Sequence, residues 1–187
     1  TGYYFDQREQ RRSVEERSAN KRVLDLFSYV GGFALAAARG GASHVTSVDS
    51  SAIAITMLGH HASAHGYDQT VDTVCSDVRT YLDRAHAAKE RFDLVIVDPP
   101  KFAPTNKHAE RARVAYRRLN AHAFKLVRPG GMVLTCSCSA AIDEADFIRT
   151  LALAARDAVR EVSVFRVGKQ GSDHPVPAAF PEGMYLK

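Results

Sequence analysis

Several acidic residues and a pair of glycines have the types and spacing needed to bind a nucleoside. Asp25 lies in a short apolar segment, and Asp49 and Asp77 each close a later apolar segment. Gly31 and Gly32 follow the first segment and allow the backbone to approach a ligand closely. A carboxylate in the position of Asp49 can accept two hydrogen bonds from a ribose diol. Asp77 is placed to accept a hydrogen bond from an adenine amino group.

The glycines do not form a dinucleotide-binding turn. Residues 25–33 read Asp-Leu-Phe-Ser-Tyr-Val-Gly-Gly-Phe, which lacks the G-x-G-x-x-G pattern that holds a pyrophosphate. A ribose and an adenine without a pyrophosphate indicate S-adenosylmethionine rather than NAD, so an NAD oxidoreductase is the poorest interpretation. Each aspartate alone fits a helix cap equally well. The three aspartates together with the glycine loop favour a cofactor site.

A second group of reactive residues lies in the later half of the chain. Asp98-Pro99-Pro100 closes a nearly continuous apolar run, and Cys136 and Cys138 lie at the end of the next one. A cysteine thiolate is a strong nucleophile, and a nearby carboxyl group can supply or accept a proton. Free cysteines are also often small buried hydrophobic residues, and Cys75 fits that interpretation. No second Cys/His pair has zinc spacing, so we expect no metal.

Alternating elements would position these groups at one edge of a sheet. Apolar, β-branched runs predict strands, and alanine-rich or amphipathic runs that end at glycine predict helices. The alternation predicts an α/β fold, a Rossmann-like, doubly wound, mostly parallel seven-stranded sheet with helices on both faces. The predicted strands are 23–27, 45–48, 71–75, 92–97, 132–136 and 161–167, with another beginning at 184–187, and the predicted helices are 33–39, 51–65, 78–89, 109–127 and 143–158.

Composition limits the class of protein. The chain has 187 residues, 45% of them hydrophobic and 25% charged, which is typical of one globular domain. No apolar run reaches the length of a membrane span. Three cysteines form no disulfide framework, which predicts a reduced, cytoplasmic setting. The net charge of +4 is compatible with a polyanionic partner without indicating one.

Five segments, in order along the chain, resemble one family. They are Gly2-Tyr3-Tyr4-Phe5-Asp6-Gln7-Arg8, Phe27-Ser28-Tyr29-Val30-Gly31-Gly32-Phe33, Asp98-Pro99-Pro100-Lys101-Phe102, Ser137-Cys138-Ser139, and Asp173-His174-Pro175 with Phe180-Pro181-Glu182-Gly183. Together they are similar to the class I S-adenosylmethionine-dependent methyltransferases, and to the large-subunit ribosomal RNA 5-methylcytosine methyltransferases in particular. The resemblance implies an N-terminal arm over residues 1–22 that contributes Phe5, Asp6 and Arg8 to a lid over the methionine end of the cofactor. It also implies a catalytic domain over residues 23–187 and an RNA-binding module that precedes this chain.

The resemblance also implies site residues. Cys138 would be the nucleophile, with Cys136 as the alternative, and Asp98 the acid that contacts the base. The expected substrate-binding residues are Pro100, Lys101, Phe102 and Arg117, and Phe102 or Tyr116 could stack on the base. The expected contacts of S-adenosylmethionine, or of its product S-adenosyl-L-homocysteine, are Phe5, Asp6, Arg8, Asp25, Phe27, Ser28, Gly31, Gly32, Phe33, Asp49, Ser50, Asp77, Val78, Asp98 and Pro99.

Two other functions stay open. Amino-group methyltransferases carry a similar Asp-Pro-Pro segment followed by an aromatic residue, whereas this chain has Lys101 there and Phe102 one position later. A catalytically idle methyltransferase-like fold could serve as an RNA-binding platform. The expected partner is large-subunit ribosomal RNA, with a homodimer possible in the full-length protein and no membrane contact.

Overall fold

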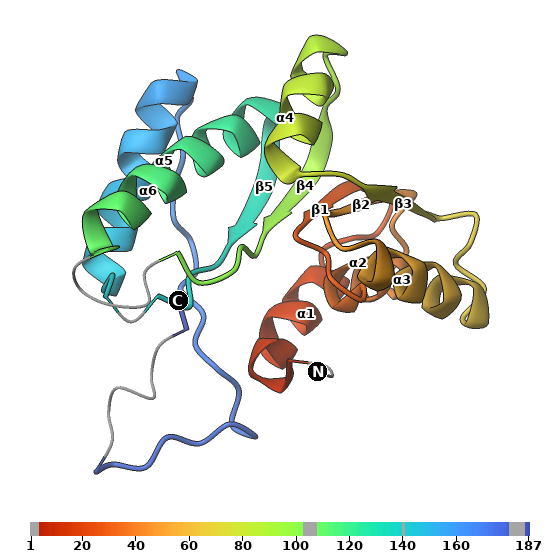
Figure 1. Ribbon diagram of the computed structural model, residues 1–187, viewed down its shortest axis with the longest axis horizontal. Coiled ribbons are helices and arrows are strands. Elements are labelled where there is room, and N and C mark those ends of the chain that lie inside the picture. Colours follow the sequence, from red (N-terminus) through yellow and green to blue (C-terminus); the bar gives the residue numbers. More distant parts are fainter. Residues whose placement is uncertain (1–3, 103–107, 140, 180–185) are drawn as a thin grey trace.

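The sheet has five strands, all parallel (Figure 1). The structure is a computed structural model that describes residues 4–102, 108–139, 141–179 and 186–187. The strands are β1 (Arg22–Leu26), β2 (His44–Asp49), β3 (Val71–Cys75), β4 (Phe92–Val97) and β5 (Val127–Thr135). Their spatial order is β3-β2-β1-β4-β5. The order reverses between β1 and β4, so the carboxyl ends of these two strands form the topological switch point where such sheets bind ligands.

Helices cover both faces of the sheet (Figure 1). They are η1 (Phe5–Gln7), α1 (Arg8–Glu15), α2 (Gly32–Arg39), α3 (Ala52–Ala64), α4 (Val78–Ala87), α5 (Ala109–Leu126) and α6 (Glu144–Ala158). Apolar side chains of α1, α2 and α3 pack on one face, and those of α4 and α5 pack on the other. α6 packs on α5 through small residues, among them Ala121, Ala154 and Ala158.

Local sequence explains why these elements begin where they do. Ser51 caps α3 by accepting the Ala54 N–H, and Asp143 caps α6 by accepting the Asp146 N–H. The central strands β1 and β4 are built from β-branched and aliphatic residues that are almost wholly buried, as expected for a parallel sheet covered on both faces. The doubly wound α/β fold predicted from the sequence is therefore confirmed.

The predicted strand at residues 161–167 was wrong. That segment has no strand conformation, and its apolar residues Val162, Val164, Phe165 and Val167 are 43–69% exposed. A strand needs a neighbouring strand to complete its backbone hydrogen bonds. Within the described part of the chain, no strand pairs with residues 161–167. Seven strands are not seen there.

The chain end returns to the end of β5. Ser137 and Lys187 exchange two backbone hydrogen bonds, of 2.7 and 3.2 Å. The family motif residues Gly2, Tyr3 and Phe180 to Gly183 lie outside the described residues, as do Met184 and Tyr185 of the last predicted strand. No helix in the described ranges is long and apolar enough to cross a membrane.

Candidate active site

The loop between β1 and α2 has a strained backbone. Phe27, Tyr29 and Gly31 have φ angles of 62°, 49° and 90°, in the left-handed region that non-glycine residues seldom adopt. Such strain persists where the surroundings fix the backbone, and it is concentrated at ligand sites. At Gly31 a side chain is also excluded by space, because a Cβ atom there would lie 2.6 Å from Leu58 Cγ. The loop therefore brings bare backbone to the switch point.

Asp49 holds this loop in place from the end of β2. One of its carboxylate oxygens accepts the Tyr29 N–H at 2.9 Å, and the other accepts the Ser51 N–H at 2.8 Å. Ser28 adds a backbone hydrogen bond to Val48, at 3.0 Å. Each carboxylate oxygen can accept a second hydrogen bond, so Asp49 retains capacity for the two hydroxyls of a ribose.

Asp77 lies at the end of the described edge strand β3. Its Oδ1 accepts the N–H groups of Arg79 and Thr80 and thereby caps α4. Asp77 and Ser50 are exposed, whereas Val78, the first residue of α4, is buried in the core. The helix-cap interpretation of Asp77 is thus correct, and its remaining oxygen leaves room for an adenine contact.

Asp25 is the most unusual acidic residue in the protein. Its side chain is fully buried, and neither oxygen has a hydrogen-bond partner of normal geometry among the described residues. Burial raises the pKa of Asp25 well above the ordinary value, and the charges of Asp98 and Asp49 raise it further, while the nearby Ala34 N–H opposes the shift. A buried carboxylate without a partner is costly. This position suits a cationic ligand.

The amino-terminal residues reach the same edge of the sheet. Tyr4 contacts the ring of Tyr29 edge to face, with 6.0 Å between centroids, and Phe5 is exposed. Arg8 forms an ion pair with Asp173 at 3.2 Å, which joins the first and last family motifs. Val14 of α1 is buried against α2 and the sheet. The predicted lid residues therefore lie beside the glycine loop.

Asp98 at the end of β4 links this segment to the second reactive group. Its Oδ1 accepts the Gln7 side-chain N–H at 3.1 Å. Burial raises the pKa of Asp98 to about 6, the charge of Asp6 adds to this rise, and the hydrogen bond from Gln7 opposes it. Asp98 can therefore exchange a proton near neutral pH.

The two cysteines at the end of β5 differ in accessibility. Cys136 is buried and Cys138 is half-buried. Burial raises the pKa of both thiols, as does the charge of Asp98, while the charge of Lys101 opposes the rise at Cys138. Cys75, expected to be packed inside, is instead exposed at the end of β3. Of the cysteines near Asp98, Cys138 is the accessible one.

The predicted substrate-binding residues are only partly brought together. Pro99 is buried, while Pro100 and Lys101 are exposed beside Asp98. Phe102 packs on Tyr116, with 4.8 Å between ring centroids. Tyr116 is fully buried, so it cannot stack on a substrate base as predicted.

Arg117 lies apart from this group. Its guanidinium forms a two-pronged ion pair with Asp157 of α6, at 2.6 and 2.7 Å. The Asp157 carboxylate holds the pKa of Arg117 above its usual value. The structure therefore shows Arg117 joining α5 to α6, and a role in RNA binding would require this pair to open.

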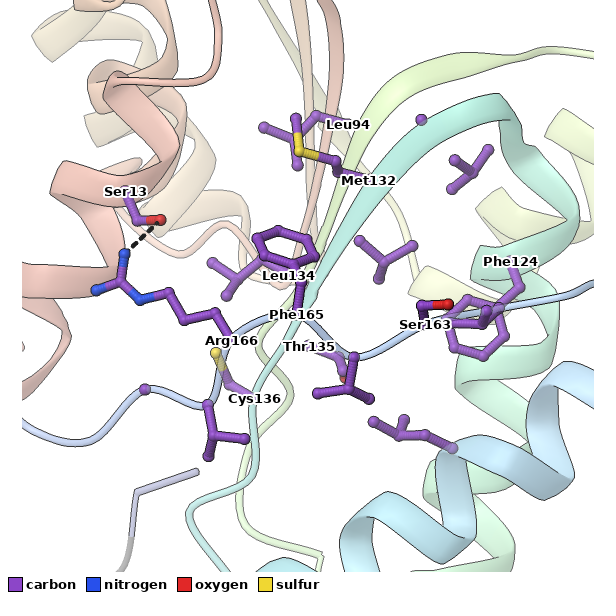
Figure 2. A pocket seen from close by; sticks show the side chains of 18 of the residues that line it. Ser13, Leu94, Phe124, Met132, Leu134, Thr135, Cys136, Ser163, Phe165 and Arg166 are labelled. Carbon is purple, nitrogen blue, oxygen red and sulfur yellow. Dashed lines mark hydrogen bonds between the residues drawn. The ribbon is translucent and has the colours of Figure 1, made fainter.

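An apolar cavity of about 570 Å³ lies beside β5 rather than over the glycine loop (Figure 2). Leu94, Met132 and Leu134 line it from the sheet, and Cys136 lies near the end of β5. Arg166 from the segment after α6 donates to the Ser13 hydroxyl across it, at 3.2 Å. The cavity shares Cys136 with the candidate site and lies on its β5 side.

Sequence reasoning missed the contact made by Gln7 and the buried position of Tyr116. Gln7 was quoted as part of a family motif but given no role, and Tyr116 was assigned to the wrong surface. Gln7 lies 91 positions from Asp98, and no local pattern reports a contact over such a distance. The described residues contain no cluster of three or more His, Cys, Asp or Glu side chains able to hold a metal.

The charges of the site fit S-adenosylmethionine. Asp25, Asp49 and Asp98 lie close enough for their charges to raise the pKa of Asp25. A sulfonium and an ammonium group would relieve this repulsion, and Asp49 and Asp77 have free lone pairs for the ribose and the adenine. The residues present therefore fit this cofactor.

Comparisons with known proteins agree with this geometry. Residues 1–179 match the family described as S-adenosylmethionine-dependent methyltransferase. A solved structure of SMU.776 in complex with SAH superposes with a TM-score of 0.85 at 26% identity, covering 100% of this chain and 49% of that one. A second solved structure, of a putative SAM-dependent methyltransferase from Streptococcus mutans, superposes with a TM-score of 0.86 at 25% identity, covering 100% of this chain and 48% of that one.

Curated relatives carry a more specific name. The "Ribosomal RNA large subunit methyltransferase I" of Aeromonas salmonicida (strain A449) is 40% identical over 188 residues, which are 100% of this chain and 48% of the relative. The Escherichia coli O139:H28 protein of the same name is 41% identical over 192 residues, again 100% and 48%. The chain thus spans about half the length of these relatives. With a family match over nearly its whole length and a site whose charges suit the cofactor, the chain belongs to the S-adenosylmethionine-dependent methyltransferases.

Proposed function

We propose that this chain is the catalytic part of an enzyme that forms 5-methylcytosine in large-subunit ribosomal RNA, with Cys138 as nucleophile and Asp98 as acid. The names of the curated relatives support a large-subunit ribosomal RNA substrate. Such a substrate places the enzyme in the cytoplasm, in keeping with three cysteines that form no disulfide. The residues that precede the catalytic domain would close over the cofactor.

The observation that carries the proposal is the position of Cys138 next to Asp98. The two residues follow neighbouring strands, β5 and β4, and are close enough for the Asp98 charge to raise the pKa of the Cys138 thiol. C5 of cytosine is a poor nucleophile and needs covalent activation at C6. A thiol and a proton-carrying acid beside the methyl donor are the two groups which that chemistry requires.

The reaction would proceed through a covalent adduct on the base. The Cys138 thiolate adds to C6 and forms a C–S bond, while N3 takes a proton from the Asp98 carboxyl group. S-adenosylmethionine, when bound, would supply an electrophilic methyl group to the electron-rich C5, and as the C5–CH3 bond forms the S–CH3 bond would break and S-adenosyl-L-homocysteine would leave. A base then removes the C5 proton, the C–S bond breaks with its electron pair on Cys138, and N3 returns its proton to Asp98.

The protonation states support these roles. A pKa of about 6 leaves roughly a tenth of Asp98 protonated at pH 7, a reserve that an ordinary aspartate lacks. The raised pKa of Cys138 keeps its thiol neutral in the free protein, and Lys101 lies close enough to favour the thiolate. The Cys138 thiol must therefore lose its proton, against its raised pKa, before it attacks the base.

The first test replaces single cysteines in the full-length protein. Native protein, Cys138→Ser and the matched control Cys136→Ser are incubated with unmodified large-subunit ribosomal RNA and methyl-labelled S-adenosylmethionine. The RNA is digested and the labelled nucleosides are separated. We expect label in 5-methylcytidine with the native protein, a loss of at least about 1,000-fold in Cys138→Ser, and retained activity in Cys136→Ser. Label in another nucleoside, or full activity of Cys138→Ser, would overturn the proposal.

One observation favours an amino-group methyltransferase as the second candidate. Asp98-Pro99-Pro100 follows β4 with Asp98 turned toward Gln7 and the lid residues, where a carboxylate could accept hydrogen bonds from an exocyclic amine. That reaction does not use the thiol. Cys138→Ser would then be nearly silent and Asp98→Ala severe, and the label would appear in an N-methylated nucleoside or in protein.

A further inference from the structure

A buried hydroxyl network lies directly beneath the segment that carries Cys138. Tyr116 of α5 is fully buried, as are Ser137 and Ser139, the two neighbours of Cys138 in the chain. The Ser137 hydroxyl donates to the Tyr116 hydroxyl at 3.1 Å, and the Tyr116 and Ser139 hydroxyls share a hydrogen bond of the same length. One phenol group therefore contacts both residues that flank the nucleophile.

The same network fixes the backbone of this segment. The Ser139 N–H donates to the Ser137 hydroxyl at 3.3 Å, and the Lys187 ammonium donates to the Ser139 carbonyl at 3.1 Å. The backbone of Ser137 is paired with Lys187, at 2.7 and 3.2 Å. The segment after β5 has no strand conformation, so these bonds supply the order that a sheet would otherwise provide.

The tyrosine ring is itself held rigidly. It packs between Phe102 and Phe147, with centroid distances of 4.8 and 5.3 Å, and shares an apolar cluster with Ile142. Burial raises the pKa of Tyr116, against hydrogen bonds from Ser137 and Ser139 that lower it. Its hydroxyl therefore stays protonated and can both donate and accept within the network.

We infer that Tyr116 is a positioning residue for Cys138. Its hydroxyl orders Ser137 and Ser139, and these residues present the Cys138 thiol toward the neighbouring end of β4 and C6 of the base. The inference rests on the proposed function, because it matters only if Cys138 attacks the substrate. A misplacement of about 1 Å costs on the order of 100-fold in rate, so loss of one buried hydroxyl can affect catalysis without contact with either substrate.

The principal test is Tyr116→Phe, which keeps the ring and removes only the hydroxyl. The matched control is Tyr81→Phe, at a second buried tyrosine, on α4, which belongs to a different apolar cluster from Tyr116. We expect kcat of Tyr116→Phe to fall by about 10- to 100-fold, while the dissociation constant of S-adenosylmethionine and the KM for RNA change less than about threefold. Tyr81→Phe should leave kcat unchanged.

A chemical readout reports the thiol directly. In a Cys75→Ser background the rate of Cys138 alkylation by iodoacetamide is followed by mass spectrometry. Tyr116→Phe should change this rate severalfold, because an unfixed segment no longer holds the thiol half-buried beside Asp98 and Lys101. Tyr81→Phe should not change it. An unchanged alkylation rate with native kcat in Tyr116→Phe would overturn the inference.

The remaining outcomes separate the two proposals. If Cys138→Ser is fully active, the proposed function is wrong, whatever Tyr116→Phe does. If Cys138→Ser is inactive and Tyr116→Phe has native kcat, the proposed function stands and the inference is wrong. If Tyr116→Phe does not fold, Ser139→Ala removes one arm of the network with less loss of packing. Native kcat in Ser139→Ala would then count against the inference, and a fall in kcat at constant cofactor affinity would support it.

Discussion

The carboxyl ends of β1 and β2 and those of β4 and β5 form adjoining halves of one site, but different kinds of contact hold them in place. At β1 and β2 the contacts are local and largely made by the backbone. Asp49 accepts the N–H groups of Tyr29 and Ser51, and Ser28 bonds to the backbone of Val48. This cofactor half is ordered by a loop and by the strand next to it.

At the ends of β4 and β5 the contacts are made by side chains from segments that are distant in the sequence. Gln7 bonds to Asp98 across 91 positions, and Tyr116 bonds to Ser137 and Ser139 across 21 and 23. The cofactor half thus resembles a rigid receptor, whereas the chemistry half depends on the amino-terminal segment that carries Gln7 and on α5. Substitutions in the two halves should separate cofactor binding from turnover.

The largest effect is expected at Asp98. Asp98→Asn keeps the shape of the side chain and removes its titratable proton, so methyl transfer should fall by about 100- to 10,000-fold. The dissociation constant of the cofactor, measured by calorimetry, should change little if the two halves are separable. In the native protein the acidic limb of the kcat/KM profile should lie near the pKa of Asp98, at about 6.

The pH profile provides the control for this prediction. Asp98 loses its proton around pH 6, which should offset the gain in Cys138 thiolate and stop the rise of the native profile there, and Asp98→Asn should abolish this break. In Asp98→Asn the Cys138 thiol still titrates, so the residual activity should keep rising with pH above 6, because the thiolate is the reactive form. Loss of cofactor binding in Asp98→Asn would show that the two halves are one unit and would contradict the comparison.

At Asp49 we expect a smaller effect, and we expect it on cofactor affinity rather than on turnover. Asp49→Ala removes hydrogen bonds to the ribose worth about 1.5–3 kcal/mol each, and it releases the Tyr29 and Ser51 N–H groups. Cofactor affinity should fall by about 10- to 150-fold for each bond lost, while kcat at saturating cofactor stays within severalfold. Asp143→Ala serves as a control, because it removes the cap of α6, which lies outside the cofactor half. Unchanged affinity in Asp49→Ala would favour the non-catalytic platform.

The cofactor half was predictable because its determinants are close together in the sequence. Asp25, the glycines and Asp49 follow one another within 25 positions, and strand-helix alternation fixes which strand ends meet. Even there, the sequence did not show that Asp25 lacks a hydrogen-bond partner of normal geometry among the described residues, because burial depends on what packs around it. The caps at Ser51, Asp77 and Asp143 depend on neighbouring N–H groups and were predicted as caps or helix starts.

The chemistry half was predictable in its residue types but not in its contacts. Asp98 and Cys138 stood out by their motifs, while Tyr116 was predicted to stack on a base and is instead buried beneath the Cys138 segment. The position of Tyr116 in the helical pattern of α5 cannot show which residue of α6 packs against its ring. The predicted strand at residues 161–167 failed for a similar reason. Alternating apolar residues indicate a strand, but a strand forms only where a neighbour offers its hydrogen bonds.

The smallest predicted effect concerns stability rather than turnover, and it tests whether Asp25 is a receptor for positive charge. The folded-state pKa of Asp25 is raised well above 3.8, so the folded protein retains a proton that the unfolded chain releases. Stability should therefore fall as the pH rises above about 4, by about 1.4 kcal/mol for each unit of the shift. Asp25→Asn lacks this loss, so its melting temperature relative to the native protein should rise from pH 4 to pH 8.

Cofactor should reduce the difference in melting temperature between the two proteins. If an ammonium or sulfonium group neutralises Asp25, saturating S-adenosylmethionine at pH 8 should raise the melting temperature of the native protein more than that of Asp25→Asn. Melting curves at pH 4, 6 and 8, with and without cofactor, measure both differences. A gain in Asp25→Asn that does not vary with pH would mean that Asp25 carries no buried charge, and the cofactor half would then owe its affinity to the loop backbone and Asp49 alone.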